Sequence, residues 1–158
     1  MDDTVTTRYM VRLLLDDLGR FEVVGEAADG ATAVEVAGAT RPGAILLDLE
    51  MPGVTGWDAL PRLREAAPEA VIVTASFLPE GVARPSDTLA PDGGHDTTVE
   101  ADASVYKVSD DWVEQAAARM LELASARGPG RWPSWERRRG EQAPAAGSER
   151  RRGTAFPG

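Results

Sequence analysis

Short apolar runs alternate along the chain with segments that have a helical apolar repeat. The apolar or β-branched runs fall at residues 21–27, 43–48, 71–75 and 104–107. Runs of this length, bounded by turn residues, are typical of buried strands. Because helical segments separate them, the pattern predicts an α/β domain: a doubly wound parallel sheet covered by helices on both faces.

Apolar residues that recur every three or four positions predict the helices. These are expected at residues 4–18, 31–39, 56–67 and 110–126. Ser109 or Asp110 is expected to cap the last one. The side chains expected on the apolar faces are Met10, Leu13, Leu14 and Leu18, widened by Val11 and Leu15, in the first helix, Ala33, Val34, Val36 and Ala37 in the second, Leu60 and Leu63 in the third, and Trp112, Val113, Ala116, Met120 and Leu123 in the last.

Two stretches break the alternation. Residues 78–98 contain three prolines and three glycines where a helix between parallel strands is expected, so they predict an irregular loop. From Gly128 onward Pro, Gly, Arg and Ala dominate without periodicity, which predicts a disordered tail. The expected organisation is therefore one domain over residues 1–126, irregular at 78–98, and a tail over 127–158.

Charge divides along the same boundary. The tail from Arg127 carries 8 Arg and 3 Glu, a net charge of +5, so the first 126 residues carry −14 of the total of −9. An acidic body argues against nucleic-acid binding. The chain has no cysteine and no apolar run long enough to cross a membrane, which fits a cytoplasmic protein.

Candidate chemistry gathers where the predicted strands end. Asp48 follows the apolar run Ala44–Leu47 and precedes a Met-Pro-Gly turn, so it lies at the carboxyl end of a buried strand. In open α/β sheets that edge is where ligands bind. A second acidic pair, Asp2 and Asp3, begins the chain. Three carboxylates that meet there would repel one another and would need a hard, oxygen-binding cation such as Mg²⁺.

These residues resemble a known family. The segment from Glu22 to Gly30, the acid-x-x-Met-Pro-Gly-x-x-Gly spacing from Asp48 to Gly56, and Lys107 resemble the CheY-like receiver domain of bacterial two-component response regulators. The resemblance covers roughly residues 2–126. It implies the flavodoxin-like receiver fold and a phosphorelay function, in which a histidine kinase donates a phosphoryl group.

The resemblance also implies a role for each site residue. Asp48 looks like the phospho-acceptor, and Asp2, Asp3, Asp48 and the backbone carbonyl of Glu50 look like the Mg²⁺ ligands. Lys107 looks like the amine that pairs with the phosphoryl group. Either Thr74, by local pattern, or Ser76, by spacing from Asp48, fits the hydroxyl that bonds it.

Three departures from the family pattern keep an alternative open. No apolar strand precedes Asp2, so the expected first strand is missing, and either the true start lies upstream or the chain folds poorly. Ser104 stands at the position of the aromatic switch residue. The span from Thr74 to Lys107 is longer than usual. The alternative is a pseudo-receiver that binds partners without phosphorylation.

The expected output is limited. No helix-turn-helix pattern follows the last predicted helix, so the receiver is expected to act without its own DNA-binding domain, on an unknown downstream protein. Its chemistry is expected to be self-directed phosphoryl transfer and not that of a metabolic enzyme. A homodimer is left open. The lack of a Gly- or Ser/Thr-rich phosphate loop argues against a flavin-binding relative of the same fold.

Overall fold

A computed structural model describes residues 1–77 and 101–127 of the chain. Within them the elements follow one another in the order α1 (Val5–Asp17), α2 (Gly30–Thr40), β1 (Ala44–Asp48), α3 (Gly56–Ala66), β2 (Val71–Ser76), β3 (Ala103–Tyr106) and α4 (Trp112–Ala126). The predicted segments at residues 78–98 and from 128 onward lie outside the described residues. None of the helices in residues 1–77 and 101–127 is long and apolar enough to cross a membrane.

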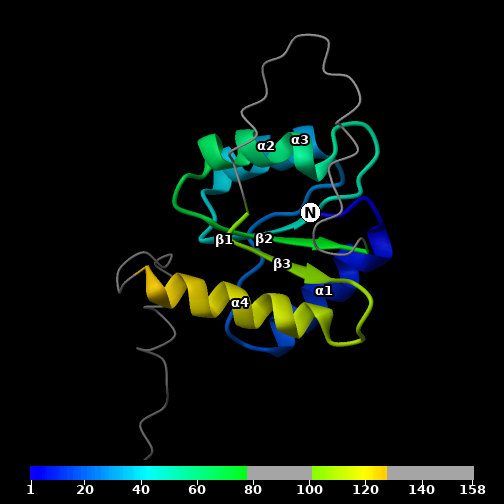
Figure 1. The fold of residues 1–158 in the computed structure, drawn as a ribbon, viewed down its shortest axis with the longest axis vertical. Helices are drawn as coiled ribbons and strands as arrows, with labels where there is room; N and C mark the ends of the chain where they lie inside the picture. Colours follow the sequence, from blue (N-terminus) through cyan, green and yellow to red (C-terminus); the bar gives the residue numbers. More distant parts are fainter. Residues whose placement is uncertain (78–100, 128–158) are drawn as a thin grey trace, which may run out of the picture.

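The three strands form one parallel sheet in the order β1-β2-β3. Asp48, the last residue of β1, is in register with Ala75, and Ala75 is in register with Val105. Helices α2 and α3 cover one face of the sheet, and α1 and α4 lie on the other (Figure 1). The α/β doubly wound arrangement predicted from the alternation is therefore confirmed.

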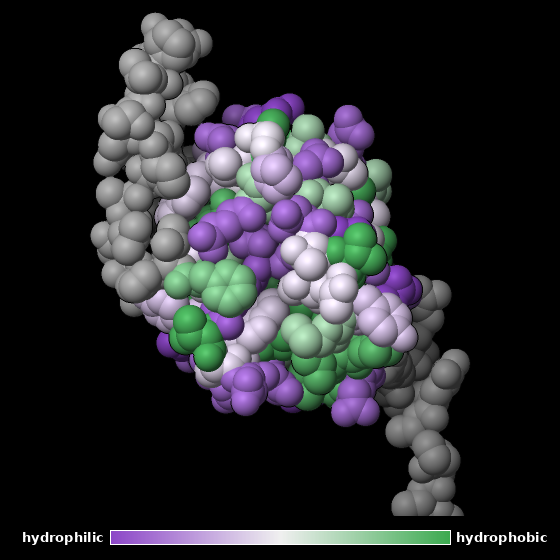
Figure 2. Space-filling model, turned by 90° about the vertical axis from the view of Figure 1, so that its right-hand side faces the viewer, coloured by the Kyte–Doolittle hydropathy of each residue, from purple (hydrophilic) through white to green (hydrophobic). Residues whose placement is uncertain are grey.

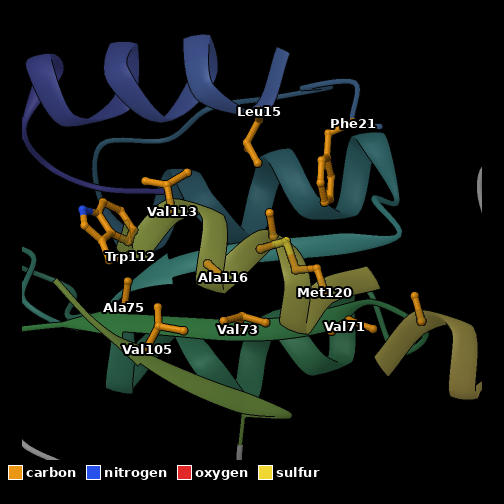
Figure 3. Packing of buried hydrophobic residues seen from close by; sticks show 12 residues of the cluster. Leu15, Phe21, Val71, Val73, Ala75, Val105, Trp112, Val113, Ala116 and Met120 are labelled. Carbon is orange, nitrogen blue, oxygen red and sulfur yellow. The ribbon is translucent and has the colours of Figure 1, made fainter. Parts of the chain in front are cut away.

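Each face of the sheet has its own apolar core. On the α2/α3 face, Leu47 and Ile72 pack with Leu60 and Leu63, as the helical repeat predicts. The other core lies between the sheet and α4. Leu15 of α1 and Phe21 of the following segment pack onto this core from the side away from the sheet (Figure 3). Its buried residues include Leu15, Phe21, Val73, Val105, Trp112, Val113, Ala116 and Met120. A sheet buried on both faces explains why the strands read as uninterrupted apolar runs.

The strand predicted at Phe21–Ala27 is wrong. The segment follows α1, but none of its residues joins the sheet; among the described residues, its only backbone hydrogen bond is from Asp2 N–H to Ala27 O, at 3.2 Å. A strand needs a partner edge for its N–H and C=O groups. In the part of the chain that the structure describes, no strand lies between this segment and β1, so its β-prone side chains do not suffice to make it one.

The predicted apolar face of α1 is confirmed only for Val11, Leu14 and Leu15, which pack in or against the core. Leu15 is the buried side chain of this helix, whereas Met10, Leu13 and Leu18 are 40%, 50% and 40% exposed. Leu14 is half-buried against the core. Because α1 packs mainly against α4, only part of its apolar stripe finds a surface to cover.

The boundaries of α4 differ slightly from the prediction. The helix begins at Trp112, and Asp111 precedes it without a side-chain cap bond, so neither Ser109 nor Asp110 caps it. Its inward stripe is otherwise as predicted: Trp112, Val113, Ala116 and Met120 are buried, and Leu123 is half-buried against the same core.

Candidate functional site

The carboxyl ends of the strands bring four predicted site residues together. Asp48 ends β1 and is 5% exposed, Asp2 lies beside it and is 6% exposed, and Lys107 follows β3 directly. Asp3 is exposed next to them. Figure 2 shows this end of the molecule, where hydrophilic side chains gather at the centre and hydrophobic ones flank them. The topology thus joins charges separated by more than a hundred positions in the sequence.

Lys107 holds the two buried carboxylates. Its Nζ lies 2.7 Å from Asp2 Oδ2 and 2.6 Å from Asp48 Oδ2, and its side chain is 5% exposed. The same Nζ lies 5.5 Å from the ring centre of Phe77 and 5.7 Å from that of Trp112. Aromatic faces attract a cation at this distance. The amine is therefore fixed by two carboxylates and by two rings.

The beginning of the chain is anchored at β1 by its backbone. The Met1 amino group donates to Leu46 O at 2.9 Å, and Met1 O accepts from Asp48 N–H at 2.9 Å. Asp2 Oδ1 accepts from Thr4 N–H at 2.9 Å, and Arg8 Nη1 donates to the backbone oxygen of Asp2. These bonds hold Asp2 in the site although no strand leads into it.

Burial and pairing together shift the pKa values of the two buried carboxyl groups, Asp2 and Asp48, in opposite directions. Burial alone would raise the pKa of Asp2, but hydrogen bonds from Lys107 and from Thr4 N–H outweigh it, so the pKa is lowered. For Asp48, burial raises the pKa, and the bonds from Lys107 and Glu50 N–H offset it only in part while the Asp2 charge adds to it. A single amine shared by two buried carboxylates leaves one of them under-neutralised.

Asp2, Asp3 and Asp48 can direct one carboxylate oxygen each into a group that spans no more than 4.8 Å. Three hard oxygen donors in such a cluster suit Mg²⁺ better than a softer, nitrogen- or sulfur-binding metal. Glu50 follows closely: its N–H donates to Asp48 Oδ1 at 3.0 Å, which fixes the turn after β1. The three carboxylates predicted from sequence as donors are thus brought together, and the predicted role of the Glu50 carbonyl stays a prediction.

The two candidate hydroxyls are placed differently. Thr74 Oγ1 is 2.8 Å from Ser104 Oγ on the neighbouring strand, and lies one residue before the partner of Asp48. Ser76 lies one residue after that partner, at the end of β2, where its Oγ donates to Glu50 Oε2 at 3.4 Å. Ser76 is therefore nearer along the sheet to the edge where Asp48 emerges.

Glycines shape the turn that follows Asp48. Gly53 has a φ of +76°, a conformation that side chains other than hydrogen disfavour. A Cβ on Gly56 would lie 2.0 Å from the backbone oxygen of Asp48 and 2.8 Å from Leu49 Cα, so α3 can start against the strand only with glycine there. Thr55 and Asp58 then form a capping box at the start of α3.

Sequence reasoning missed the buried amino terminus and the aromatic pair beside Lys107. Burial lowers the pKa of the Met1 amine from 8.0 to about 6. No pattern in the sequence indicates that a chain end is buried. Trp112 was expected only as a core residue, yet its ring also faces the site amine. The signal was present in its position, since Trp112 follows Lys107 by five residues at the same sheet edge.

Comparisons with known proteins agree with this geometry. A family model described as the response regulator receiver domain matches residues 1–80. The chain is 37% identical over 83 residues to the protein-glutamate methylesterase/protein-glutamine glutaminase of Thermotoga maritima, covering 52% of this chain and 24% of that protein. It is 31% identical over 128 residues to the enzyme of the same name from Alkalilimnicola ehrlichii, covering 81% of this chain and 33% of that protein.

The chain thus spans a quarter to a third of the length of these relatives. Among solved structures, the response regulator domain of Thermotoga maritima CheB is similar with a TM-score of 0.57 and 28% identity, over 79% of this chain and 90% of that one. Vibrio cholerae CheY4 is similar with a TM-score of 0.57 and 25% identity, over 78% and 92%. The chain therefore belongs to the response regulator receiver family of two-component phosphorelay systems.

Proposed function

We propose that the protein is a phosphoryl-accepting switch in which Asp48 is the acceptor. One observation carries the proposal: the buried Asp48 carboxylate lies in one cluster with the carboxylates of Asp2 and Asp3, and it lies 2.6 Å from the Lys107 amine. Receiver domains receive phosphate from histidine kinases and bind Mg²⁺ through an acidic pocket. We extend both properties to the named residues of this chain.

The proposed step is a displacement at phosphorus. A carboxylate oxygen of Asp48 forms the new O–P bond, the P–N bond of a kinase phosphohistidine breaks, and the imidazole leaves with the electron pair. Lys107 moves from the Asp48 carboxylate to the phosphoryl oxygens and neutralises part of their charge. Hydrolysis of the acyl phosphate returns Asp48 to its free form and resets the switch.

Asp2, Asp3 and Asp48 are the side chains that would hold Mg²⁺, with the backbone carbonyl of Glu50 as a further proposed ligand. When bound, the ion would neutralise the carboxylates and bind phosphoryl oxygens. Hydrogen bonds within the protein already orient these ligands: Arg8 and Thr4 N–H fix Asp2, and Glu50 N–H fixes Asp48. These bonds use one side-chain oxygen of each carboxylate, and the other, Oδ2, contacts Lys107 in both residues.

We propose Ser76, and not Thr74, as the hydroxyl that bonds the phosphoryl group. Thr74 is engaged across the sheet with Ser104, whereas Ser76 Oγ bonds Glu50 two positions from Asp48. A rotation of the Ser76 side chain exchanges one hydroxyl bond for another at the site. The discriminating measurement is phosphate retention: Ser76→Ala is expected to change the lifetime of the acyl phosphate more than Thr74→Ala does.

The test of the proposed function is phosphorylation in vitro. The full chain is incubated with acetyl phosphate and Mg²⁺ and its intact mass is measured. We expect a gain of one phosphoryl group that is lost in alkali and is missing in Asp48→Asn, a variant that keeps the shape of the side chain. Asp111→Asn is the matched control, because Asp111 lies outside the pocket and bonds only α4 residues and its own loop.

The alternative is a pseudo-receiver that binds a partner without accepting phosphate. The replacement of the aromatic switch residue by Ser104 favours it, because Ser104 is engaged with Thr74 on the neighbouring strand and has no ring that could couple phosphorylation to an output surface. A protein that binds Mg²⁺, as measured by quenching of tryptophan fluorescence, but gains no mass from acetyl phosphate would support this alternative. The methylesterase activity in the names of the relatives belongs to those proteins and is no part of the proposal.

A further inference from the structure

The Lys107 amine has partners of two kinds. Two are the carboxylates of Asp2 and Asp48, at 2.7 and 2.6 Å from Nζ. The other two are the rings of Phe77 and Trp112, whose centres lie 5.5 and 5.7 Å from Nζ. The charge of a carboxylate is shared when it binds a cation and moves when it is phosphorylated, whereas an aromatic ring is unchanged by both events. The two kinds of partner therefore differ in how long they can hold the amine.

Phosphoryl transfer weakens both ion pairs of Lys107. When an oxygen of Asp48 forms the O–P bond, the carboxylate becomes an acyl phosphate and the negative charge moves to the phosphoryl oxygens. Asp2 is a proposed Mg²⁺ ligand, so its charge would be shared between the ion and the amine. A lysine head group is strongly hydrated and its stem is flexible. The amine would therefore turn toward water unless another partner keeps it at the site.

The two rings differ in their exposure. Phe77 is 61% exposed, whereas Trp112 is 7% exposed. The attraction between a cation and a ring is stronger where water is excluded, and it is strongest for the ring of tryptophan. The side chain of Lys107 is itself only 5% exposed. Trp112 is therefore the stronger of the two aromatic partners.

The core fixes the position of the Trp112 ring. Figure 3 shows the ring in the layer between α4 and the sheet, in the same apolar cluster as Ala75 and Val105. The turn that joins it to Lys107 is held at both ends: Lys107 N–H donates to Ser76 O at 2.9 Å, and Trp112 N–H donates to Ser109 O at 3.3 Å. The ring is thus a fixed surface beside the site, and the amine moves relative to it.

We propose that Trp112 is a positioning residue, which keeps the Lys107 amine at the site while the amine passes from the carboxylates to the phosphoryl group. The inference rests on the proposed function of Asp48. The face of the ring attracts the amine in the free and in the phosphorylated protein alike, because the transfer does not change the ring. Trp112 acts through Lys107 and contacts neither the phosphoryl group nor the cation.

The first test compares rates of phosphorylation of the full chain by acetyl phosphate and Mg²⁺, followed by intact mass. We expect Trp112→Leu to accept the phosphoryl group about tenfold more slowly and Trp112→Phe to stay within about threefold of the unchanged protein, because phenylalanine keeps an aromatic face. Met120→Ala is the control, since Met120 is a buried residue of the same helix and the same core. It should lose stability and keep the rate. Equal rates for Trp112→Leu and the unchanged protein would overturn the inference.

Fluorinated tryptophan at position 112 separates the attraction from packing. Fluorine atoms keep the shape of the ring and reduce the negative charge on its face, which weakens the attraction for a cation. The rate of phosphorylation should fall as fluorine atoms are added, while the stability measured with urea stays the same. A rate that does not depend on fluorination would show that Trp112 serves the core alone. This test also holds if Trp112→Leu does not fold.

A readout that needs no phosphoryl transfer distinguishes this inference from the proposed function. Lys107 is the only lysine in the sequence, so protein labelled with isotopes in lysine gives the nuclear magnetic resonance signals of this side chain alone. We expect its terminal methylene signal to be displaced by the ring current of Trp112, with and without Mg²⁺, and the displacement to be lost in Trp112→Leu. A mass gain without a displaced signal overturns the inference alone, whereas a displaced signal without a mass gain overturns the proposed function.

Discussion

The two edges of β1 are built in different ways. Toward β2, five in-register pairs run from Ala44 to Asp48, and Leu49 N–H extends the ladder to Ala75 O. On the other edge, within residues 1–77 and 101–127, only Met1 pairs with the strand, through Leu46 O and Asp48 N–H. Asp48 is therefore held by a complete ladder, whereas Asp2 and Asp3 depend on a short anchored end. The two halves of the site have unequal support.

The largest effect is expected from a change on the well-supported side. Gly56→Ala places a Cβ 2.0 Å from Asp48 O, a backbone overlap that only movement of α3 or of the strand end relieves. We expect a loss of about 3 kcal/mol in the free energy of unfolding, measured with urea, and weaker Mg²⁺ binding because Asp48 shifts.

The control is a second glycine-to-alanine change within a helix. A Cβ on Gly38 in α2 would meet only Ala66 Cβ at 3.9 Å, an ordinary contact. Gly38→Ala should stabilise by roughly 0.5–1 kcal/mol, because alanine is the better helix former. If both variants lose the same stability, the close approach at Gly56 is not what positions the end of β1.

The less supported edge can be probed through the buried amino terminus. Burial lowers the pKa of the Met1 amine from 8.0 to about 6, so the folded state binds fewer protons than the unfolded chain between these pH values. Stability is then full above pH 8.0 and falls as the pH drops to about 6. The loss is about 2–3 kcal/mol, from two pKa units.

Acetylation of Met1 should remove this slope. The acetylated nitrogen keeps an N–H for Leu46 O and carries no charge, so urea unfolding should give a higher stability than the free amine at pH 6 and an equal one at pH 9. The comparison is made without divalent cations. Parallel pH profiles for the two forms would contradict the burial of the amine.

At the other end of the sheet, near the beginning of β2 and β3, one carboxylate accepts several hydrogen bonds. Asp102 Oδ2 accepts from Ile72 N–H at 2.8 Å and from Arg64 at 3.0 Å, and Oδ1 accepts from Arg127. Burial would raise the pKa of Asp102, but these donors outweigh it and lower it. The stabilisation is present above pH 3.8 and is lost as the pH falls through the lowered value.

Asp102→Asn should therefore cost about 1–2 kcal/mol at pH 7. The difference from the unchanged protein should shrink as the pH falls from 3.8, where Asp102 is protonated in the unfolded chain, through the lowered pKa at which it is protonated in the folded protein as well. Asp111→Asn, at an exposed position beside α4, should change stability by less than about 0.5 kcal/mol. Equal losses for the two variants would show that the carboxylate does not tie β2 to β3.

The sequence predicts the paired strands β1 and β2 well, and the segment from Phe21 to Ala27 on the other side of β1 poorly. Ala44–Asp48 and Val71–Ser76 are short apolar runs, and each has a neighbour to pair with, so the local pattern and the fold agree. Phe21–Ala27 has the same strand composition, yet it forms no strand. Strand propensity expresses itself only against a partner edge, and that edge lies outside any local window.

The candidate site follows the same division. Asp48, Asp2 and Lys107 are brought together as the strand ends imply, because parallel strands deliver their carboxyl ends to one side. The choice between Thr74 and Ser76 could not be made from spacing, since it depends on the register of β2 against β1. The exposure of Met10, Leu13 and Leu18 in α1 was also missed, because the helical repeat shows which residues share a face and not what lies beneath each of them.

The smallest expected effect concerns the ion pairs that hold the segment from Phe21 to Ala27 against α1. Glu26 pairs with Arg12 at 2.7 Å and with Arg8 at 3.8 Å, and its side chain is 34% exposed. Since solvent screens this carboxylate, Glu26→Gln should cost no more than about 0.5 kcal/mol, and less at high salt. Glu122→Gln is the matched control, because Glu122 pairs with Arg119 on the exposed surface of α4.

Amide exchange distinguishes the two variants: Glu26→Gln should speed exchange at Asp2, whose N–H bonds Ala27 O, while Glu122→Gln should leave it unchanged. Unchanged exchange in both would mean that the backbone bond alone, and not the ion pairs, keeps the segment from Phe21 to Ala27 beside the amino end.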